Sequence, residues 1–155
     1  LPLKYVSNKI TKSQIIDKVK IINSFWLKHF KKKPKIAITG LNPHCESIDN
    51  FNEDEKIIGP SIQFLKKNRF DVSGPLPADT IFLKNNRKKF EVIIGMYHDQ
   101  ILTPAKTLFE YDAINVTAGL PFIRVSPDHG PNEKMLGKNI SNPLSLIRSI
   151  QFLDF

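Results

Sequence analysis

The 155-residue sequence has one cysteine, Cys45, and one tryptophan. A single cysteine excludes a framework of internal disulfides and favours a reducing compartment, so we expect a cytoplasmic protein. No apolar run approaches the ~20 residues needed to cross a bilayer, and no signal-peptide pattern is present. We therefore expect no membrane partner. The hydrophobic share of 41% is ordinary for a globular chain with one core.

Acidic residues are scarce relative to basic ones, 15 against 23, which gives a formal charge of +8. Such an excess raises nucleic acid as a partner. The densest group of lysines runs from Lys28 to Lys35, however, at the end of an expected helix, where cations complement the helix dipole and stay solvated. No nucleic-acid-binding motif accompanies it. We expect no nucleic-acid partner.

The sequence does contain an unbroken apolar run that starts at Val92 and ends in His98 and Asp99. Such a run is typical of a strand buried on both faces of a parallel sheet. Ligands of open α/β sheets bind beyond the carboxyl ends of such strands, so this His-Asp pair is a candidate for chemistry. The alternative is a polar turn after a core strand.

A second histidine, His44, follows another short apolar strand, expected at residues 36–39. If both strands are parallel in one sheet, His44 and His98 emerge at the same edge. Two imidazoles with carboxylates nearby indicate a divalent-metal site, although two histidines are fewer than a usual ligand set.

Between these strands we expect a helix over residues 54–68 that is kinked or starts late at Gly59-Pro60. An earlier helix should begin at Thr11 with a capping box. The segment Ser73–Thr80 is expected to be a rigid turn that holds Asp79 in place. The alternative role for Asp79 is to cap a short helix.

The last third of the chain offers groups suited to an anion. Lys106, Asn115 and Arg124 would fit a phosphate together, Arg124 through its guanidinium fork, although each residue type taken alone is more often found simply at the surface. Two short strands are expected, at residues 113–117 and 122–125. After Asp128-His129-Gly130 comes a loop, and Asn142-Pro143 predicts the start of a final helix.

Five sequence motifs, in their order along the chain, resemble the carboxyl-terminal half of the 4-hydroxythreonine-4-phosphate dehydrogenase family. They are Gly40-Leu41-Asn42-Pro43-His44, Gly74-Pro75-Leu76-Pro77-Ala78-Asp79-Thr80, Met96-Tyr97-His98-Asp99-Gln100, Gly119-Leu120-Pro121-Phe122-Ile123-Arg124 and Asp128-His129-Gly130.

The resemblance implies an incomplete α/β chain, part of a three-layer α/β/α sandwich of the isocitrate and isopropylmalate dehydrogenase type. Residues 1–125 would form the central metal- and substrate-binding domain. Residues 126–155 would be the cofactor-side loop and helix of the other domain. A homodimer with shared active sites is also implied.

The same resemblance implies an NAD- or NADP-dependent enzyme that oxidises 4-phosphohydroxy-L-threonine to a β-keto acid, which decarboxylates to 3-amino-2-oxopropyl phosphate. His44 and His98 would bind zinc, magnesium or cobalt, with a third histidine expected directly before Leu1. The other implied roles are catalysis for Asp79 and Asp99, substrate phosphate binding for Lys106, Asn115 and Arg124, and cofactor binding for His129, Gly130 and Asn142.

The sequence departs from the family pattern at three places. Cys45-Glu46-Ser47 replaces a glycine-rich start of the loop after the metal histidine, Pro131-Asn132 replaces Thr-Ala, and Ile101 replaces a glycine. These changes bear on cofactor affinity and loop closure more than on the fold. Two alternatives stay open: a related dehydrogenase acting on a four-carbon sugar-acid phosphate, and a non-catalytic half that serves as a dimerising or binding module.

Overall fold

The computed structural model describes residues 1–48, 51–130 and 133–154. Pro131-Asn132, one of the departures from the family pattern, lies outside the described residues. The chain divides into two compact units, Leu1–Leu102 and Thr103–Phe155, which we describe separately. The division expected at residue 125 concerns the domains of a longer subunit and stays a prediction.

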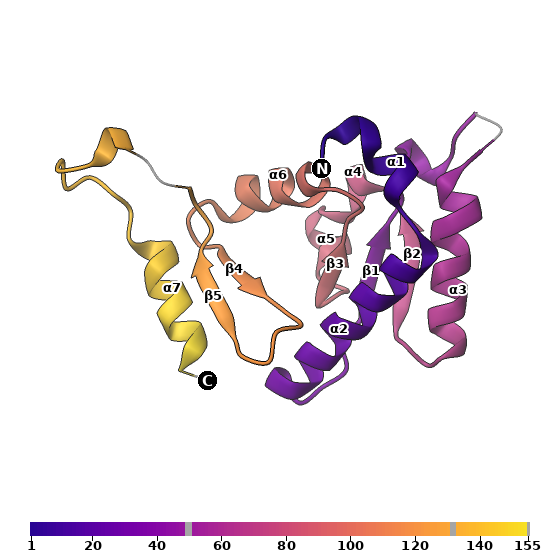
Figure 1. Cartoon of the computed structure of the whole chain (residues 1–155), viewed down its shortest axis with the longest axis horizontal. Helices are drawn as coiled ribbons and strands as arrows, with labels where there is room; N and C mark the ends of the chain where they lie inside the picture. Colours follow the sequence, from indigo (N-terminus) through magenta and orange to yellow (C-terminus); the bar gives the residue numbers. More distant parts are fainter. Residues whose placement is uncertain (49–50, 131–132, 155) are drawn as a thin grey trace. The chain divides into compact units, whose positions relative to one another are not determined.

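The first unit is built on a parallel sheet of three strands in the order β2-β1-β3 (Figure 1). The strands are β1 (Ile36–Thr39), β2 (Val72–Leu76) and β3 (Val92–Ile94). Ile36 pairs with Val72 on one side and with Val92 on the other, so all three strands run in the same direction. This confirms the expected α/β class with a parallel sheet.

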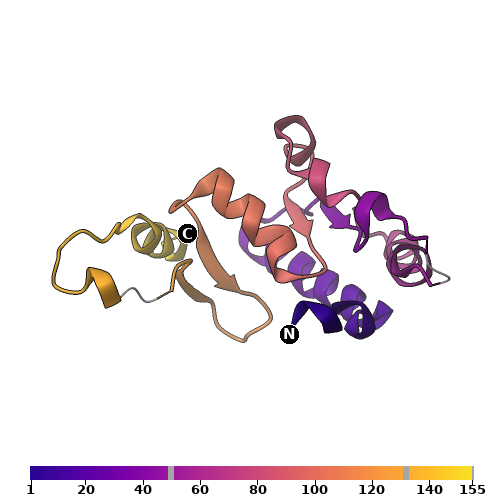
Figure 2. The same ribbon diagram turned by 90° about the horizontal axis from the view of Figure 1, so that it is seen from above.

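One face of the sheet carries the core of the first unit. Ile36 and Ile38 point into a buried cluster with residues of α2 (Lys12–Phe30) and α3 (Gly59–Lys67), which lie beside the strands in both ribbon views (Figures 1 and 2). The cap of α2 is as expected, because the Thr11 side chain accepts a hydrogen bond from the Gln14 N–H at 3.3 Å.

The expected disturbance at Gly59-Pro60 is confirmed in an unusual form. A π-helical turn, η3 (Asp54–Ile58), precedes α3, and the Gly59 N–H donates to the carbonyl of Asp54 five residues back. Pro60 has no backbone N–H to donate, so the π-helical turn can lead into α3 at this position without leaving a donor unpaired at Pro60.

The prediction of a rigid turn at residues 73–80 is wrong for its first half, which is strand β2. Gly74 and Pro75 are tolerated because β2 is an edge strand, where a missing N–H costs no ladder bond. Gly74 has a φ of +143°, and a Cβ there would lie 2.3 Å from the Ile38 carbonyl oxygen. The pairing register shifts at this point. Asp79 follows in the first turn of α4 (Ala78–Ile81).

The second unit is an antiparallel pair of strands covered by a helix. Strands β4 (Ile114–Thr117) and β5 (Arg124–Pro127) pair with Val116 opposite Val125, and α7 (Leu144–Leu153) lies along them (Figure 1). The second strand begins two residues later than expected. Helix α6 (His98–Phe109) spans the division between the units.

The other short elements are η1 (Leu3–Tyr5), α1 (Val6–Lys9), η2 (Pro43–Cys45), α5 (Lys84–Arg87) and η4 (Glu133–Met135). Among the described residues, no helix is both long and apolar enough to cross a membrane.

Candidate functional site

His44 lies just beyond the carboxyl end of β1, in the short 3-10 turn η2. Its backbone is left-handed, with φ 56° and ψ 14°, and its side chain is exposed. A left-handed backbone is uncommon in residues with a side chain and is found mainly at turns and functional sites. The turn therefore presents an imidazole to solvent at the edge of the sheet.

A cavity of about 270 Å³ opens at the same edge of the first unit. Its walls come from the turn after β1, the start of α4 and the segment between β3 and α6. The lining residues are Leu41, Asn42, Pro43, His44, Ala78, Asp79, Tyr97 and Gln100. His44 and Asp79, which lie 35 positions apart in the sequence, thus line one cavity, whose volume approaches that of small-ligand sites.

His98 and Asp99 open helix α6 directly after Tyr97, one of the cavity residues. The His98 Nδ1 lies 2.6 Å from the Asp99 Oδ1. Both side chains are largely exposed, at 76% and 78%. When Nδ1 carries the proton, it donates to Asp99 and leaves the Nε2 lone pair free to bind a cation. The first turn of a helix also favours the Asp99 carboxylate.

The donor chemistry of this edge fits a divalent cation, because imidazoles and carboxylates are ligands for zinc, cobalt and magnesium. The described residues nevertheless contain no cluster of three or more His, Cys, Asp or Glu side chains that could hold an ion. The metal role expected for His44 and His98 therefore stays a prediction.

Two buried side chains at this edge were not assigned a role from the sequence. Asp54 is 2% exposed and Gln100 is 8% exposed, and both contact the backbone that leads from β1 to His44. Gln100 is the last residue of the motif that begins at Met96, but a local sequence pattern does not reveal which backbone groups a side chain contacts. Burial first, and then the charge of Asp54, raise the pKa of the Cys45 thiol in this turn.

In the second unit, the strand pairing places Asn115 and Arg124 on one face of the hairpin. Thr117 lies directly opposite Arg124, and Asn115 is two residues before Thr117. The Arg124 Nη1 donates to the Thr117 Oγ1 at 3.1 Å. Arg124 and Asn115 are both exposed, so this face presents a guanidinium and an amide to solvent.

Lys106 lies elsewhere in the unit. Its Nζ contacts the Asp128 Oδ2 at 2.9 Å and also the Asp128 carbonyl oxygen. Asp128 directly follows the last residue of β5 and comes four residues after Arg124, which is roughly 13 Å at the usual rise of a strand. In this structure the ammonium of Lys106 is thus held by a carboxylate at the opposite end of β5 from Arg124.

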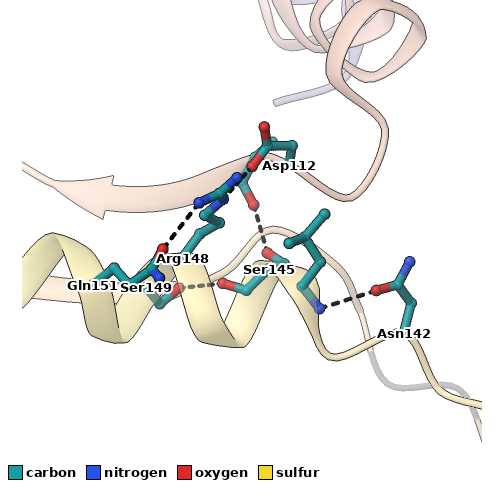
Figure 3. Close-up of polar contacts among 8 residues, drawn as sticks. Asp112, Asn142, Ser145, Arg148, Ser149 and Gln151 are labelled. Carbon is teal, nitrogen blue, oxygen red and sulfur yellow. Dashed lines mark hydrogen bonds and ion pairs between the residues drawn. The ribbon is translucent and has the colours of Figure 1, made fainter.

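The residues expected to bind the cofactor flank the loop between β5 and α7. His129 and Gly130 are exposed. The Asn142 Oδ1 accepts from the Leu144 N–H at 3.0 Å (Figure 3). Helix α7 begins at Leu144 with Pro143 at the N-cap, one residue later than the start predicted from Asn142-Pro143.

The entry to that loop is fixed by Ser145, which is 1% exposed on the strand-facing side of α7. The Ser145 hydroxyl donates to the Ala113 carbonyl (Figure 3) and accepts from the Asp128 N–H at 2.9 Å. The backbone directly before His129 is therefore tied to α7 and to the start of β4.

Comparison with known proteins identifies relatives of the chain. The family profile of the pyridoxal phosphate biosynthetic protein PdxA matches residues 1–153. A 4-hydroxythreonine-4-phosphate dehydrogenase of Sulfurihydrogenibium sp. is 46% identical over 97% of this chain and 47% of its own length. A D-threonate 4-phosphate dehydrogenase of Pectobacterium atrosepticum is 42% identical over 76% of this chain and 36% of its own.

Comparison with solved structures gives the same relationship. That of a putative 4-hydroxythreonine-4-phosphate dehydrogenase from Salmonella typhimurium superposes with a TM-score of 0.81 at 34% identity, over 97% of this chain and 46% of that one. The chain spans about half the length of the curated relatives it matches. With the profile matching almost every residue, the chain belongs to the family of the pyridoxal phosphate biosynthetic protein PdxA.

Proposed function

We propose that the protein containing this chain is a metal-dependent NAD or NADP dehydrogenase. It oxidises 4-phosphohydroxy-L-threonine to a β-keto acid, which loses carbon dioxide to give 3-amino-2-oxopropyl phosphate. One observation supports the proposal above all. In this member of the family, His44 follows β1 and His98 follows β3, and these two strands are parallel neighbours in the sheet. Homodimerisation and a cytoplasmic location are part of the same proposal.

His44 and His98 would hold the divalent ion, which we expect to be zinc, magnesium or cobalt. When bound, such an ion supplies Lewis-acid polarisation of the substrate hydroxyl. The contact of Asp99 with Nδ1 of His98 supports this role, because it favours the tautomer with a free Nε2. Asp99 would thereby orient a ligand as well as contribute charge.

Asp79 is the better placed of the two carboxylates to accept the hydroxyl proton, because it lines the cavity beside His44. When bound, the nicotinamide would accept hydride from the carbon that carries this hydroxyl. The substrate would thus lose a proton from its O–H bond and a hydride from its C–H bond, two protons and two electrons in all. His129, Gly130 and Asn142 would contact the cofactor.

The substrate phosphate would bind to Arg124 and Asn115, which share an exposed face of the hairpin. Arg124 offers the fork that suits a phosphate. Lys106 would join them only by leaving Asp128, so its contribution requires a rearrangement of the ion pair. Anchoring the phosphate fixes the position of the reacting carbon.

A second substrate is favoured by one comparison, since a relative that is 42% identical is a D-threonate 4-phosphate dehydrogenase. D-Threonate 4-phosphate keeps the phosphate and the secondary hydroxyl but carries a hydroxyl in place of the amino group. Steady-state kinetics of the full-length protein with both substrates separates the alternatives. The proposed substrate should have the larger kcat/KM, and the reverse order would reassign the enzyme.

The metal assignment is tested by His44→Ala and His98→Ala in the full-length protein, with His29→Ala on α2 as the control. Metal content by elemental analysis and NADH formation should fall together in the first two variants and be unchanged in the third. Stoichiometric metal retained in His98→Ala would place the site elsewhere.

A further inference from the structure

The amino ends of the three parallel strands in the first unit meet at one edge of the sheet, opposite the edge that carries the cavity. Backbone hydrogen bonds join the residues that enter the strands. The Ile36 N–H donates to the Asp71 carbonyl at 2.9 Å, and the Glu91 N–H donates to the Lys35 carbonyl at 3.1 Å. The segments that come together in this way (Figure 1) are residues 28–35, 66–71 and 88–91.

Each of these three segments carries exposed cations, which together we call the basic edge. They are Lys28, Lys31, Lys32, Lys33 and Lys35 before β1, Lys66, Lys67 and Arg69 before β2, and Lys88 and Lys89 before β3. The same segments contribute two carboxylates, Asp71 and Glu91, and Glu91 is already paired with Lys32 at 3.1 Å. Within the described part of the chain, no other cation of the basic edge forms an ion pair. The edge therefore carries a large positive excess.

The helix dipole accounts for only part of the basic edge. Lys28, Lys66 and Lys67 lie in the last turns of α2 and α3, where cations complement the dipole. That effect falls off within the last turn, whereas Lys33 and Lys89 lie beyond the ends of the helices. A solvated helix end was a sufficient explanation for one lysine-rich segment in the sequence. The fold adds two further segments to the same edge, and this explanation does not cover them.

An exposed aromatic residue belongs to the same surface. Phe30 is 44% exposed and is the last residue of α2, directly before Lys31. Its ring packs on the ring of Trp26 with 4.3 Å between the centroids, and this contact holds it in place. Single-stranded nucleic acids bind where a basic surface follows the phosphates and an aromatic ring stacks on a base.

We propose that the basic edge binds single-stranded nucleic acid, with its lysines contacting phosphates and Phe30 stacking on a base. A bilayer is the less suitable polyanion. Stable attachment to it needs an apolar insertion beside the cations, and the apolar side of α2 is buried in the core. The inference goes beyond the dehydrogenase reaction and does not depend on it, because the basic edge and the cavity lie at opposite ends of the strands.

The experiment measures binding of a fluorescent oligouridylate to the full-length protein by anisotropy, over a series of salt concentrations. The probe has about 20 nucleotides, enough to cover the ~4–16 nucleotides typical of such surfaces. The triple variant Lys33→Gln/Lys67→Gln/Lys89→Gln removes one cation from each segment. It should bind about tenfold more weakly or worse. The slope of log affinity against log salt should shrink by roughly 2, because each phosphate contact with a single strand contributes about 0.7.

The matched control is Lys9→Gln/Lys18→Gln/Lys56→Gln, which removes three exposed lysines outside the basic edge and changes the net charge equally. Its affinity should stay within about twofold of wild type near 0.1 M salt, where distant charges are screened.

The stacking role is tested by Phe30→Leu, which should weaken binding roughly tenfold. Its control is Phe51→Leu, since Phe51 is 55% exposed and lies outside the basic edge. Unchanged affinity in Phe30→Leu would remove the reason to prefer a nucleic acid among polyanions and would overturn the inference.

Two other results would also overturn it. Equal weakening by both triple variants would show that net charge alone decides binding. Vesicles of phosphatidylserine and phosphatidylcholine provide the other comparison. If the wild type binds these vesicles through the basic edge and does not bind the oligouridylate, the partner is a membrane.

Discussion

A single methyl group at Gly40 should show how tightly the turn before His44 is built. In Gly40→Ala the Cβ would lie 2.6 Å from the Asp54 Oδ1 and 2.7 Å from the Cys45 Sγ. Overpacking of this kind costs about 1–3 kcal/mol in the free energy of unfolding. Urea denaturation of the full-length protein measures the loss.

The matched control is Gly130→Ala, since no atom of the described part of the chain lies within 4 Å of a Cβ at Gly130. It should change the free energy of unfolding by less than about 0.5 kcal/mol, as surface changes usually do. Equal stability of the two variants would mean that the turn relaxes freely.

The phosphate anchors are also tested at single residues. Arg124→Lys keeps the charge and loses the fork, and Lys106→Ala removes a charge that is paired with Asp128 in this structure. For both variants we expect kcat/KM of the full-length enzyme to fall. The fall should correspond to a loss of roughly 2–4 kcal/mol in transition-state stabilisation, the range for truncating one partner of a buried charge pair.

Arg148→Lys on α7 provides the control, because Arg148 binds Asp112 and Gln151 instead (Figure 3). An unchanged kcat/KM in Lys106→Ala alone would mean that Lys106 only ties α6 to Asp128. Unchanged values in both test variants would refute the phosphate assignment.

At the scale of elements, Glu91 joins the starts of β1 and β3. Its carboxylate accepts from the Lys35 N–H at 2.9 Å and from the Lys32 Nζ at 3.1 Å. The Lys35 N–H first, and the Lys32 ammonium second, lower the pKa of Glu91. A carboxyl whose pKa is lowered by folding stabilises the fold above its unfolded pKa, near 4.3, and this contribution is lost as the pH falls through the folded pKa.

Glu91→Gln should therefore lower the melting temperature at pH 7 by a few degrees and have a smaller effect at pH 3. Melting curves at both pH values measure the difference. The control is Glu55→Gln, an exposed carboxylate whose ion-pair partner among the described residues is the neighbouring Lys56. An equal effect of Glu91→Gln at both pH values would show that the carboxylate charge is irrelevant.

The elements also show what local patterns can predict. Strands β1 and β3, the cap of α2 and the break at Gly59-Pro60 were predictable because each depends on residues adjacent in sequence. Strand β2 was missed because its Gly-Pro pair indicates a turn unless the strand is known to lie at a sheet edge. Asp54 and Gln100 were missed for a related reason, since Asp54 binds Asn42, 12 residues away, and Gln100 binds Thr39, 61 residues away.

At the scale of the molecule, the last helix exposes an apolar face. Helix α7 buries Ser145 and Ser149 against the hairpin, while Leu146, Ile150 and Leu153 are 50–54% exposed. Adjacent exposed apolar side chains of this kind favour association.

We therefore expect the 155-residue chain expressed alone to self-associate and to be inactive as a dehydrogenase. It spans about half of its relatives, and its described residues do not complete a metal ligand set. Light scattering should show a mass that rises with concentration. NADH formation should fall at least tenfold below the ~1 per second of ordinary enzymes.

The double variant Leu146→Gln/Ile150→Gln should reduce this association, because it breaks the apolar face without touching the serines that bind the hairpin. Leu136→Gln is the matched control, since Leu136 is 85% exposed in the loop before α7. If the 155-residue chain stays monomeric at all concentrations, the exposed apolar face of α7 does not drive self-association. Turnover at ordinary rates would show that the residues for catalysis all lie within this chain.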